Sequence, residues 1–201
     1  SGDVNTSVYG EGSFADYLVS VAVAGNQVRV GDIVAGRVFG STRADDLPRA
    51  ARFVAAATVD SVEGIAAIRI ATADFRIDDA TPAGGALRFD LLARDTSRLR
   101  LRGHFARGDD TLLVRVDTVR FTYADVAWTN GQPLTVRDRP DGFTIDTFRL
   151  ASNRGGTLAL GAAVPREDPI RAFLRLDAFP AGELAAFALG TDRLPGLLSG
   201  A

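Results

Sequence analysis

Apolar and polar residues alternate along most of this chain, and the alternation is most regular near position 100. Arginine or histidine occupies every second position from Arg98 to His104, with Leu99 and Leu101 between them. A period of two residues is the period of a β-strand, whose side chains point alternately to two faces. A polar turn and a second alternating stretch, 111–117, follow. The pattern predicts a β-hairpin with a loop longer than two residues.

The same pattern returns 59 residues later, at 157–164 and 170–177. Phe89 and Leu91 then correspond to Phe148 and Leu150, although any two amphipathic hairpins share so coarse a pattern. A period of this size is typical of an array of similar β-units. We interpret residues 1–201 as a single fragment of such an array, with possible units at 17–82, 83–141 and 142–201. Both ends resemble interrupted elements, so we expect a piece of a longer protein.

Residues that favour turns predict where the strands end. Gly25-Asn26 and Asn130-Gly131 each predict a reversal between two strands. Solvated turns are predicted at three pairs of aspartates, Asp45-Asp46, Asp78-Asp79 and Asp109-Asp110. Residues 1–16 are rich in glycine, serine and aspartate, and they predict a short edge strand at most.

Two segments have helical character. Residues 48–58 fit a helix because Pro48 suits a first turn and alanines follow, but apolar residues also alternate there. The strand interpretation is favoured because the neighbouring segments are strands and Thr58-Val59 is β-branched. Residues 181–189 predict a short helix, since Leu184 and Phe187 fall on one helical face and Gly190 can end it.

Charged residues on one strand face and apolar residues on the other leave an apolar face that needs a cover. Two sheets could cover each other as a sandwich. Alternatively, one curved sheet could fold into a trough whose lining stays open to an apolar ligand.

Composition excludes several classes of function. The chain has a formal net charge of −2, so it offers no basic field that would hold the phosphates of a nucleic acid. It has no cysteine, which excludes thiol nucleophiles and thiolate metal sites. No apolar run approaches the roughly 18 residues of a membrane span.

Candidate chemistry is sparse. His104 is the one histidine, and we interpret it as an exposed strand residue in line with Arg98, Arg100 and Arg102. Residues 10–15 match the dinucleotide-binding fingerprint in letters, but that motif must open a helix, whereas 17–23 predicts a strand. We expect no enzyme, no cofactor and no metal site.

The second half of the chain carries a characteristic order of short motifs. An aromatic strand at 121–123 leads to Trp128, and segments 133–136, 141–152, 158–161 and 174–180 follow, then the predicted helix and 194–200. In this order the sequence resembles the repeating region of TamB-type translocation and assembly module proteins, in the AsmA-like group. Residues 17–120 fit the same style more loosely. The motifs are degenerate spacings of apolar residues, glycines and aspartates, so their order carries the resemblance.

The resemblance implies an all-β fold, namely a curved, mostly antiparallel sheet folded into an elongated apolar trough, taco-like in section. It implies a protein anchored in the inner membrane of a diderm bacterium and spanning the periplasm. Such a protein would carry phospholipid acyl chains toward the outer membrane. It would also support the assembly of surface proteins together with an outer-membrane barrel partner. The resemblance brings no catalytic residues, and this chain contains neither the anchor helix nor the C-terminal domain of the family.

Our first hypothesis is therefore a segment of a lipid conduit, and the alternative is a closed β-sandwich that acts as a structural or adhesive module without a ligand. The residues expected to line the groove are the one-sided apolar positions of the predicted strands: Val19, Val21, Val23, Leu87, Phe89, Leu91, Leu99, Leu101, Phe105, Val114, Val116, Phe143, Ile145, Phe148, Leu150, Leu158, Leu160, Leu174 and Leu176.

Overall fold

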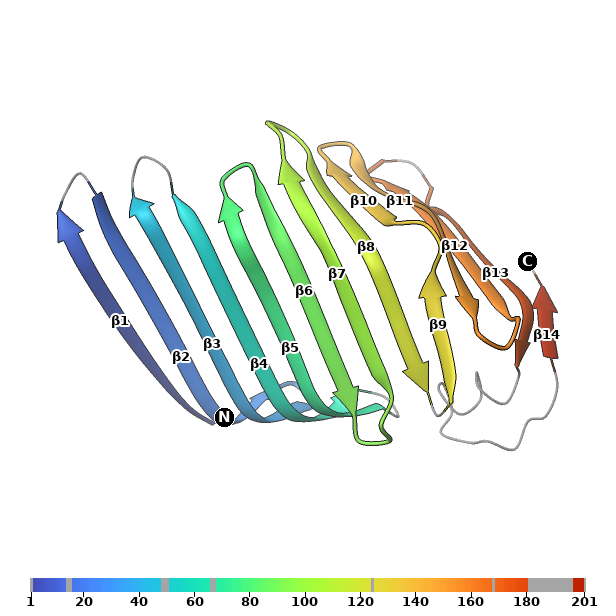
Figure 1. Cartoon of the computed structure of the whole chain (residues 1–201), viewed down its shortest axis with the longest axis horizontal. Coiled ribbons are helices and arrows are strands. Elements are labelled where there is room, and N and C mark those ends of the chain that lie inside the picture. Colours follow the sequence, from blue (N-terminus) through green and yellow to red (C-terminus); the bar gives the residue numbers. More distant parts are fainter. Residues whose placement is uncertain are drawn as a thin grey trace.

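The computed structural model describes residues 2–13, 16–47, 51–65, 68–123, 125–167, 169–180 and 197–200. These residues form one antiparallel sheet of fourteen strands and no helix, which confirms the all-β, antiparallel prediction (Figure 1). The strands are β1 (Asp3–Ser13), β2 (Asp16–Val30), β3 (Ile33–Leu47), β4 (Arg52–Ile65), β5 (Ile68–Thr81), β6 (Gly84–Ala93), β7 (Arg98–Arg107), β8 (Leu112–Tyr123), β9 (Val126–Asn130), β10 (Leu134–Arg139), β11 (Gly142–Ser152), β12 (Thr157–Pro165), β13 (Arg171–Pro180) and β14 (Leu197–Gly200).

The sheet is a meander, in which consecutive strands lie side by side in chain order. Short connections between antiparallel neighbours favour this order because they close small loops, which cost little chain entropy. β9 and β10 depart from the simple meander: both pair with β8 on one side and with β11 on the other. Together they occupy a single strand position between β8 and β11, and we call each such strand position of the sheet a lane.

Long strands replace several of the predicted turns. β2, β3 and β5 run through Gly25-Asn26, Asp45-Asp46 and Asp78-Asp79, so the turns predicted there are wrong. Asp46 and Asp79 have positive φ angles of 58° and 49°, a conformation that aspartate adopts more readily than most residues. The pairing register shifts beside both residues. Aspartates, which often form turns, form β-bulges in these strands, and a bulge inserts one residue without reversing the chain.

A row of irregular residues crosses the lower part of β2, β3 and β4. The regular pairs on either side place Gln27 opposite Gly36, and Gly36 opposite Ser61. Gln27 and Ser61 have φ angles of 50° and 57°. Such irregularities bend strands and increase their twist, and the lower ends of β2 to β5 curve in Figure 1.

Four further predictions concern the edge strand, one turn and the two ambiguous segments. β1 has 11 residues, so the prediction of a short edge strand at most is wrong. The turn at Asp109-Asp110 is confirmed between β7 and β8. β4 begins at Arg52, which confirms the strand interpretation from there to residue 58, whereas residues 48–50 lie outside the described residues. The helix predicted at 181–189 also lies outside them.

The break between β9 and β10 is held by one side chain. Asn130 Oδ1 accepts the backbone N–H of Val119 at 2.7 Å, and Asn130 Nδ2 donates to the carbonyls of Asp117 and Gln132 at 3.0 and 2.9 Å. The hydrogen bonds of the Asn130 amide replace backbone hydrogen bonds that are missing from the β-ladder here, because Pro133 has no N–H to donate. The predicted reversal at Asn130-Gly131 is therefore wrong, since the chain reverses between Tyr123 and Val126 instead.

β7 and β8 approach each other closely at Gly103, and this contact gives a stability prediction. A Cβ at position 103 would overlap the backbone of Arg115 and lie 2.7 Å from Val116 Cα. We expect Gly103→Ala to lower the free energy of unfolding by about 2 kcal/mol or more, because the two strands must separate locally. Gly131→Ala is the control, since a Cβ there would have no atom within 4 Å. Urea denaturation of both variants measures the difference, and equal midpoints would contradict the close approach.

Candidate functional site

The pairing registers divide the sheet into two faces. Residues directly opposite each other in an antiparallel ladder point to the same side of the sheet. Leu91 pairs with Leu99, and Leu99 pairs with Phe121, so these three side chains share one side. Following the registers from β1 to β13 places all the predicted lining residues on this side. We call it the apolar face.

Bulges keep the apolar residues on this face where simple alternation would move them to the other. Val116 and Val119 are three residues apart, yet both pack against Phe148. The β7–β8 register shifts between Arg102 and Gly103, which leaves one extra residue in β8. An extra residue in β11, between Ile145 and Phe148, has the same effect. Both bulges restore the apolar pattern to one side.

Three clusters form the buried parts of the apolar face. Val116, Val119 and Phe148 make one, and Val126 with Trp128 makes the second. The third lies at the bend of the long strands and contains Ala35, Val62 and Ile70. Trp128 and Phe148 are only 3% and 4% exposed. Sequence reasoning missed Val119, Trp128 and Ile70 as members of this face, because a strict two-residue period does not extend across a bulge or a reversal.

Large apolar side chains stay exposed on the same face away from these clusters. Phe75, Phe143 and Leu174 are 41%, 38% and 56% exposed, and Val8 on the edge strand is 71% exposed. The substantial contacts of each described strand are with its lateral neighbours, so no second layer of described strands covers this face. Large exposed apolar side chains gathered on one face usually mark a place where something apolar binds.

Apolar rows run across the strands in the direction of the backbone hydrogen bonds. One row crosses six lanes, from β7 through β8, β10, β11 and β12 to β13, and a second crosses five lanes from β4 to β8. Neighbouring members of each row are direct cross-strand pairs. The rows are Phe105, Val114, Val136, Ile145, Ala162 and Ala172, and Ala57, Phe75, Phe89, Leu101 and Val119.

The predicted repeat has a structural counterpart in one hairpin. Phe89 pairs with Leu101 in the β6–β7 hairpin, and Phe148 pairs with Leu160 in the β11–β12 hairpin, with a spacing of 59 residues between equivalents. The next strand breaks the equivalence, because Leu160 pairs with Leu174 although Leu101 pairs with Val119. The division of the chain into three units stays a prediction.

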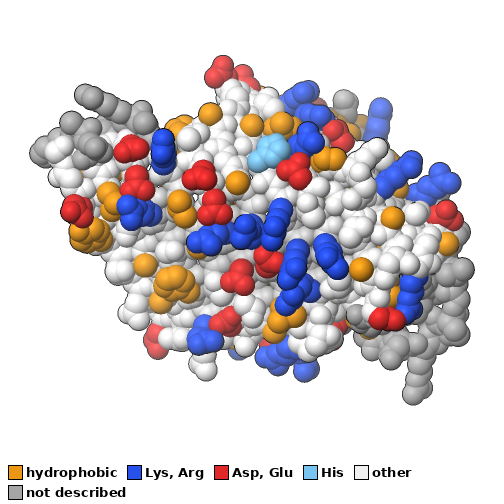
Figure 2. All heavy atoms as spheres, viewed as in Figure 1, with side chains coloured by type: hydrophobic (Ala, Val, Ile, Leu, Met, Phe, Trp, Pro, Cys, Tyr) orange, Lys and Arg blue, Asp and Glu red, His pale blue; other side chains and the backbone are white. Residues whose placement is uncertain are grey.

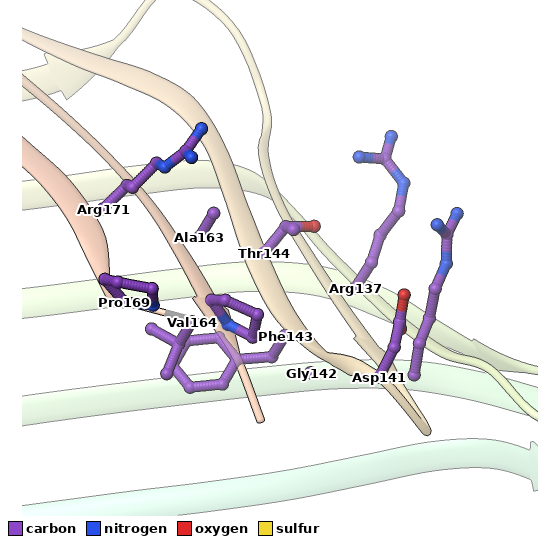
Figure 3. A pocket seen from close by; sticks show the side chains of 11 residues that line it. Arg137, Asp141, Gly142, Phe143, Thr144, Ala163, Val164, Pro169 and Arg171 are labelled. Carbon is purple, nitrogen blue, oxygen red and sulfur yellow. The ribbon is translucent and has the colours of Figure 1, made fainter. Parts of the chain in front are cut away.

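A shallow pocket lies at the upper end of β11 and β12 and is lined by residues from both faces of the sheet. It has a volume of about 240 Å³, less than the roughly 300 Å³ or more typical of small-molecule sites. Phe143, Val164 and Pro169 lie close together on one side of it, and the side chains of Arg137 and Arg171 extend away from them (Figure 3). The registers place Arg137 and Arg171 on the opposite face from Phe143 and Val164, so the pocket lies at the edge of the sheet and is not an extension of the apolar face.

The opposite face is charged, and Figure 2 shows arginines in a band across it. His104 lies on this face as expected, with Nδ1 3.1 Å from Asp117 Oδ2. Arg115 Nε donates to the other carboxylate oxygen at 2.9 Å. Half-exposed side chains paired in this way form a surface charge network. Within the described residues, no group of three or more histidines, cysteines or acidic residues could hold a metal ion.

On the edge strand β1, Tyr9 has a raised pKa. Its hydroxyl donates to Glu11 Oε2 at 2.7 Å, and this hydrogen bond raises the pKa of Tyr9 above its usual range, with a smaller contribution from desolvation. Both groups are exposed and lie far along the sheet from the pairing of His104 with Asp117.

The difference in burial along β11 gives the second prediction. We expect Phe148→Ala to lower the free energy of unfolding by about 3 kcal/mol or more, because it empties the centre of a packed cluster. Phe143→Ala, at the exposed upper end of the same strand, should cost less than about 1 kcal/mol. Equilibrium unfolding in urea compares the two variants. Equal costs would show that the apolar face is packed evenly along β11.

Comparison with known proteins identifies no relative whose function could explain this surface. A scan against protein-family models, a search of curated proteins and a search of solved structures each found no match to the chain.

Proposed function

We propose that this chain is a segment of a bridge-like lipid transport protein, and that its apolar face carries phospholipid acyl chains. The observation that carries the proposal is the apolar face itself, which carries rows of directly paired apolar residues across the strands and has no second layer over it in the described residues. Exposed Phe75, Phe143 and Leu174 lie at separate places along it.

The form of the sheet supports a trough. The row of irregular residues through Gln27, Gly36 and Ser61 bends the long strands, and the lower ends of these strands curve in Figure 1. A sheet bent toward its apolar side would surround an acyl chain on more than one side. The alternative, a closed sandwich that acts as a structural or adhesive module, needs two sheets, whereas the described strands form one.

The energetics of such a trough are favourable. Burying a chain of sixteen methylenes is worth on the order of 12 kcal/mol, at about 0.8 kcal/mol for each methylene. The phosphate head would stay in water at the margin of the sheet. Transport would consist of sliding along the apolar rows, and no covalent step is needed, so we propose a protein that is not an enzyme.

The wider setting rests on the resemblance to TamB-type proteins. It comprises a full-length protein anchored in the inner membrane, a periplasmic location, and an outer-membrane barrel partner in surface-protein assembly. The described residues include no helix long and apolar enough to cross a bilayer. The transport proposal for the apolar face can be tested on this chain alone.

Bound lipid is the direct test. We expect native mass spectrometry of the chain, purified from a diderm bacterium without detergent, to show phospholipid bound to the folded protein. The reason is that an apolar face exposed to water gains free energy when acyl chains cover it. A lipid-free, well-folded monomer from the same preparation would contradict the proposal.

A pair of neighbouring residues tests which face binds the lipid. Leu174 and Phe173 lie next to each other on β13, on opposite faces, and are 56% and 49% exposed. We expect Leu174→Asp to reduce crosslinking to a photoreactive fatty-acyl probe severalfold, because a carboxylate in an apolar groove loses its hydration. Phe173→Asp should leave crosslinking unchanged, and an equal loss in both variants would contradict the assignment.

The choice of exposed positions avoids unfolding. Leu101 and Leu160 also lie on the apolar face, but they pack against the cluster of Val116 and Phe148, so a carboxylate there would disturb the fold itself. Phe75→Asp and Phe39→Asp provide a second matched pair at the other half of the sheet, since Phe75 is on the apolar face and Phe39 on the charged one.

A further inference from the structure

The charged face of β6, β7 and β8 is strongly positive, although the whole chain has a net charge of −2. The registers place six arginines and only two aspartates, Asp90 and Asp117, on this side of the three strands. Figure 2 shows the arginine band at this place, beside the pale-blue histidine. We call these arginines the arginine patch: Arg88, Arg98, Arg100, Arg102, Arg115 and Arg120.

Like charges stand directly opposite each other in the patch. Arg76 on β5 pairs with Arg88, and Arg88 pairs with Arg102, which makes a row of three arginines on adjacent strands. Arg100 faces Arg120 in the next row. Directly opposed residues have Cα atoms only about 5 Å apart, and like charges at this distance destabilise a sheet. An arrangement of this kind is stabilised when an anion binds over it.

Aspartates of the chain neutralise only part of the patch. Arg100 Nε lies 3.2 Å from Asp90 Oδ1 but makes no hydrogen bond, although that nitrogen is buried. Arg115 pairs with Asp117 at 2.9 Å. The other four arginines have no ion-pair partner within the described part of the chain: Arg88, Arg98, Arg102 and Arg120.

The surroundings of the patch indicate what kind of anion fits. Three shallow pockets lie at the sheet margins, around Phe143, Asp109 and Tyr17, and none of the six arginines lines any of them. Protein interfaces contain buried apolar anchors, whereas the patch is bordered by Asp74 and Asp78 on β5, by threonines and small residues, and by the half-buried Leu92 and Leu113. A broad array of guanidinium groups without apolar anchors matches an array of phosphates, which guanidinium binds in a bidentate manner.

We propose that the arginine patch binds the headgroup layer of an anionic phospholipid bilayer. The attraction is electrostatic and spread over several weak contacts, as for other basic protein surfaces at anionic membranes. It places the charged face against the headgroups and directs the apolar face away from them. The proposal stands on the charged face alone and does not depend on lipid transport by the apolar face.

Vesicle sedimentation tests the proposal on the intact chain. We expect binding to vesicles that contain phosphatidylglycerol, weaker binding when salt rises from about 50 mM to about 200 mM, and little binding to pure phosphatidylcholine. The double variant Arg88→Gln/Arg102→Gln should bind anionic vesicles about 25-fold more weakly, at about fivefold for each arginine.

A matched control separates the patch from net charge. Arg37 and Arg43 lie on the same face of β3 and are ion-paired with Asp60 and Asp45. Arg37→Gln/Arg43→Gln removes the same number of charges and should change vesicle binding less than twofold. β3 lies three strands from β6, which is about 14 Å at about 4.8 Å for each strand, and charges farther than about 8–10 Å from the patch are screened. An equal loss in both double variants, or equal binding to neutral and anionic vesicles, would overturn the proposal.

Two further measurements keep the result interpretable. Arg88→Gln/Arg102→Gln should unfold at the same temperature as the unaltered chain or higher, since it relieves like-charge repulsion, so weaker binding cannot result from unfolding. Leu174→Asp, which tests the apolar face, should keep the salt-dependent binding to anionic vesicles. Loss of that binding in Leu174→Asp would show that the apolar face holds the vesicle and would overturn the role of the patch.

Discussion

The fold depends on the cross-strand register, because directly paired residues must share a face. A shift of one residue between any two strands would turn every later apolar side chain to the charged side. The chain prevents this with compensating irregularities. The extra residue in β8 lets Val116 and Val119 share a side, and the extra residue in β11 does the same for Ile145 and Phe148. The bulges are therefore part of how this sequence specifies two different faces over so many strands.

The sequence allowed the two faces to be predicted but not the ends of the strands. Alternation of leucine and arginine along β7 was enough to orient that strand, since the side-chain period of a strand has no alternative there. Asp46 and Asp79 misled the prediction because the same left-handed conformation serves a turn and a bulge. The outcome depends on whether the neighbouring strand continues past that point, and a local motif carries no such information. Trp128 was missed for a related reason, since the reversal before Val126 resets the alternation.

One antiparallel ladder thus supports two surfaces of opposite chemistry. Its strands have no second layer to pack against in the described residues, so burial comes from lateral clusters such as those around Phe148 and Trp128. Backbone hydrogen bonds between neighbours hold the rest. The exposed parts of the apolar face, and the opposed arginines of the patch, are both arrangements that stability alone does not favour. Each is better explained by an external partner than by the packing of the sheet.

The direction of the apolar rows connects the architecture to the proposed transport of acyl chains. The row from Phe105 to Ala172 runs perpendicular to the strands, with about 4.8 Å between neighbouring lanes. An acyl chain that lies along this row exchanges one apolar contact for a similar one as it moves by a lane. The free energy of burial then changes little along the path, although the total is large. Along a strand, by contrast, an acyl chain would find no such path, because bends and turns interrupt the apolar surface in that direction. A lipid conduit built from a meander must therefore run across its strands, and each added strand lengthens it.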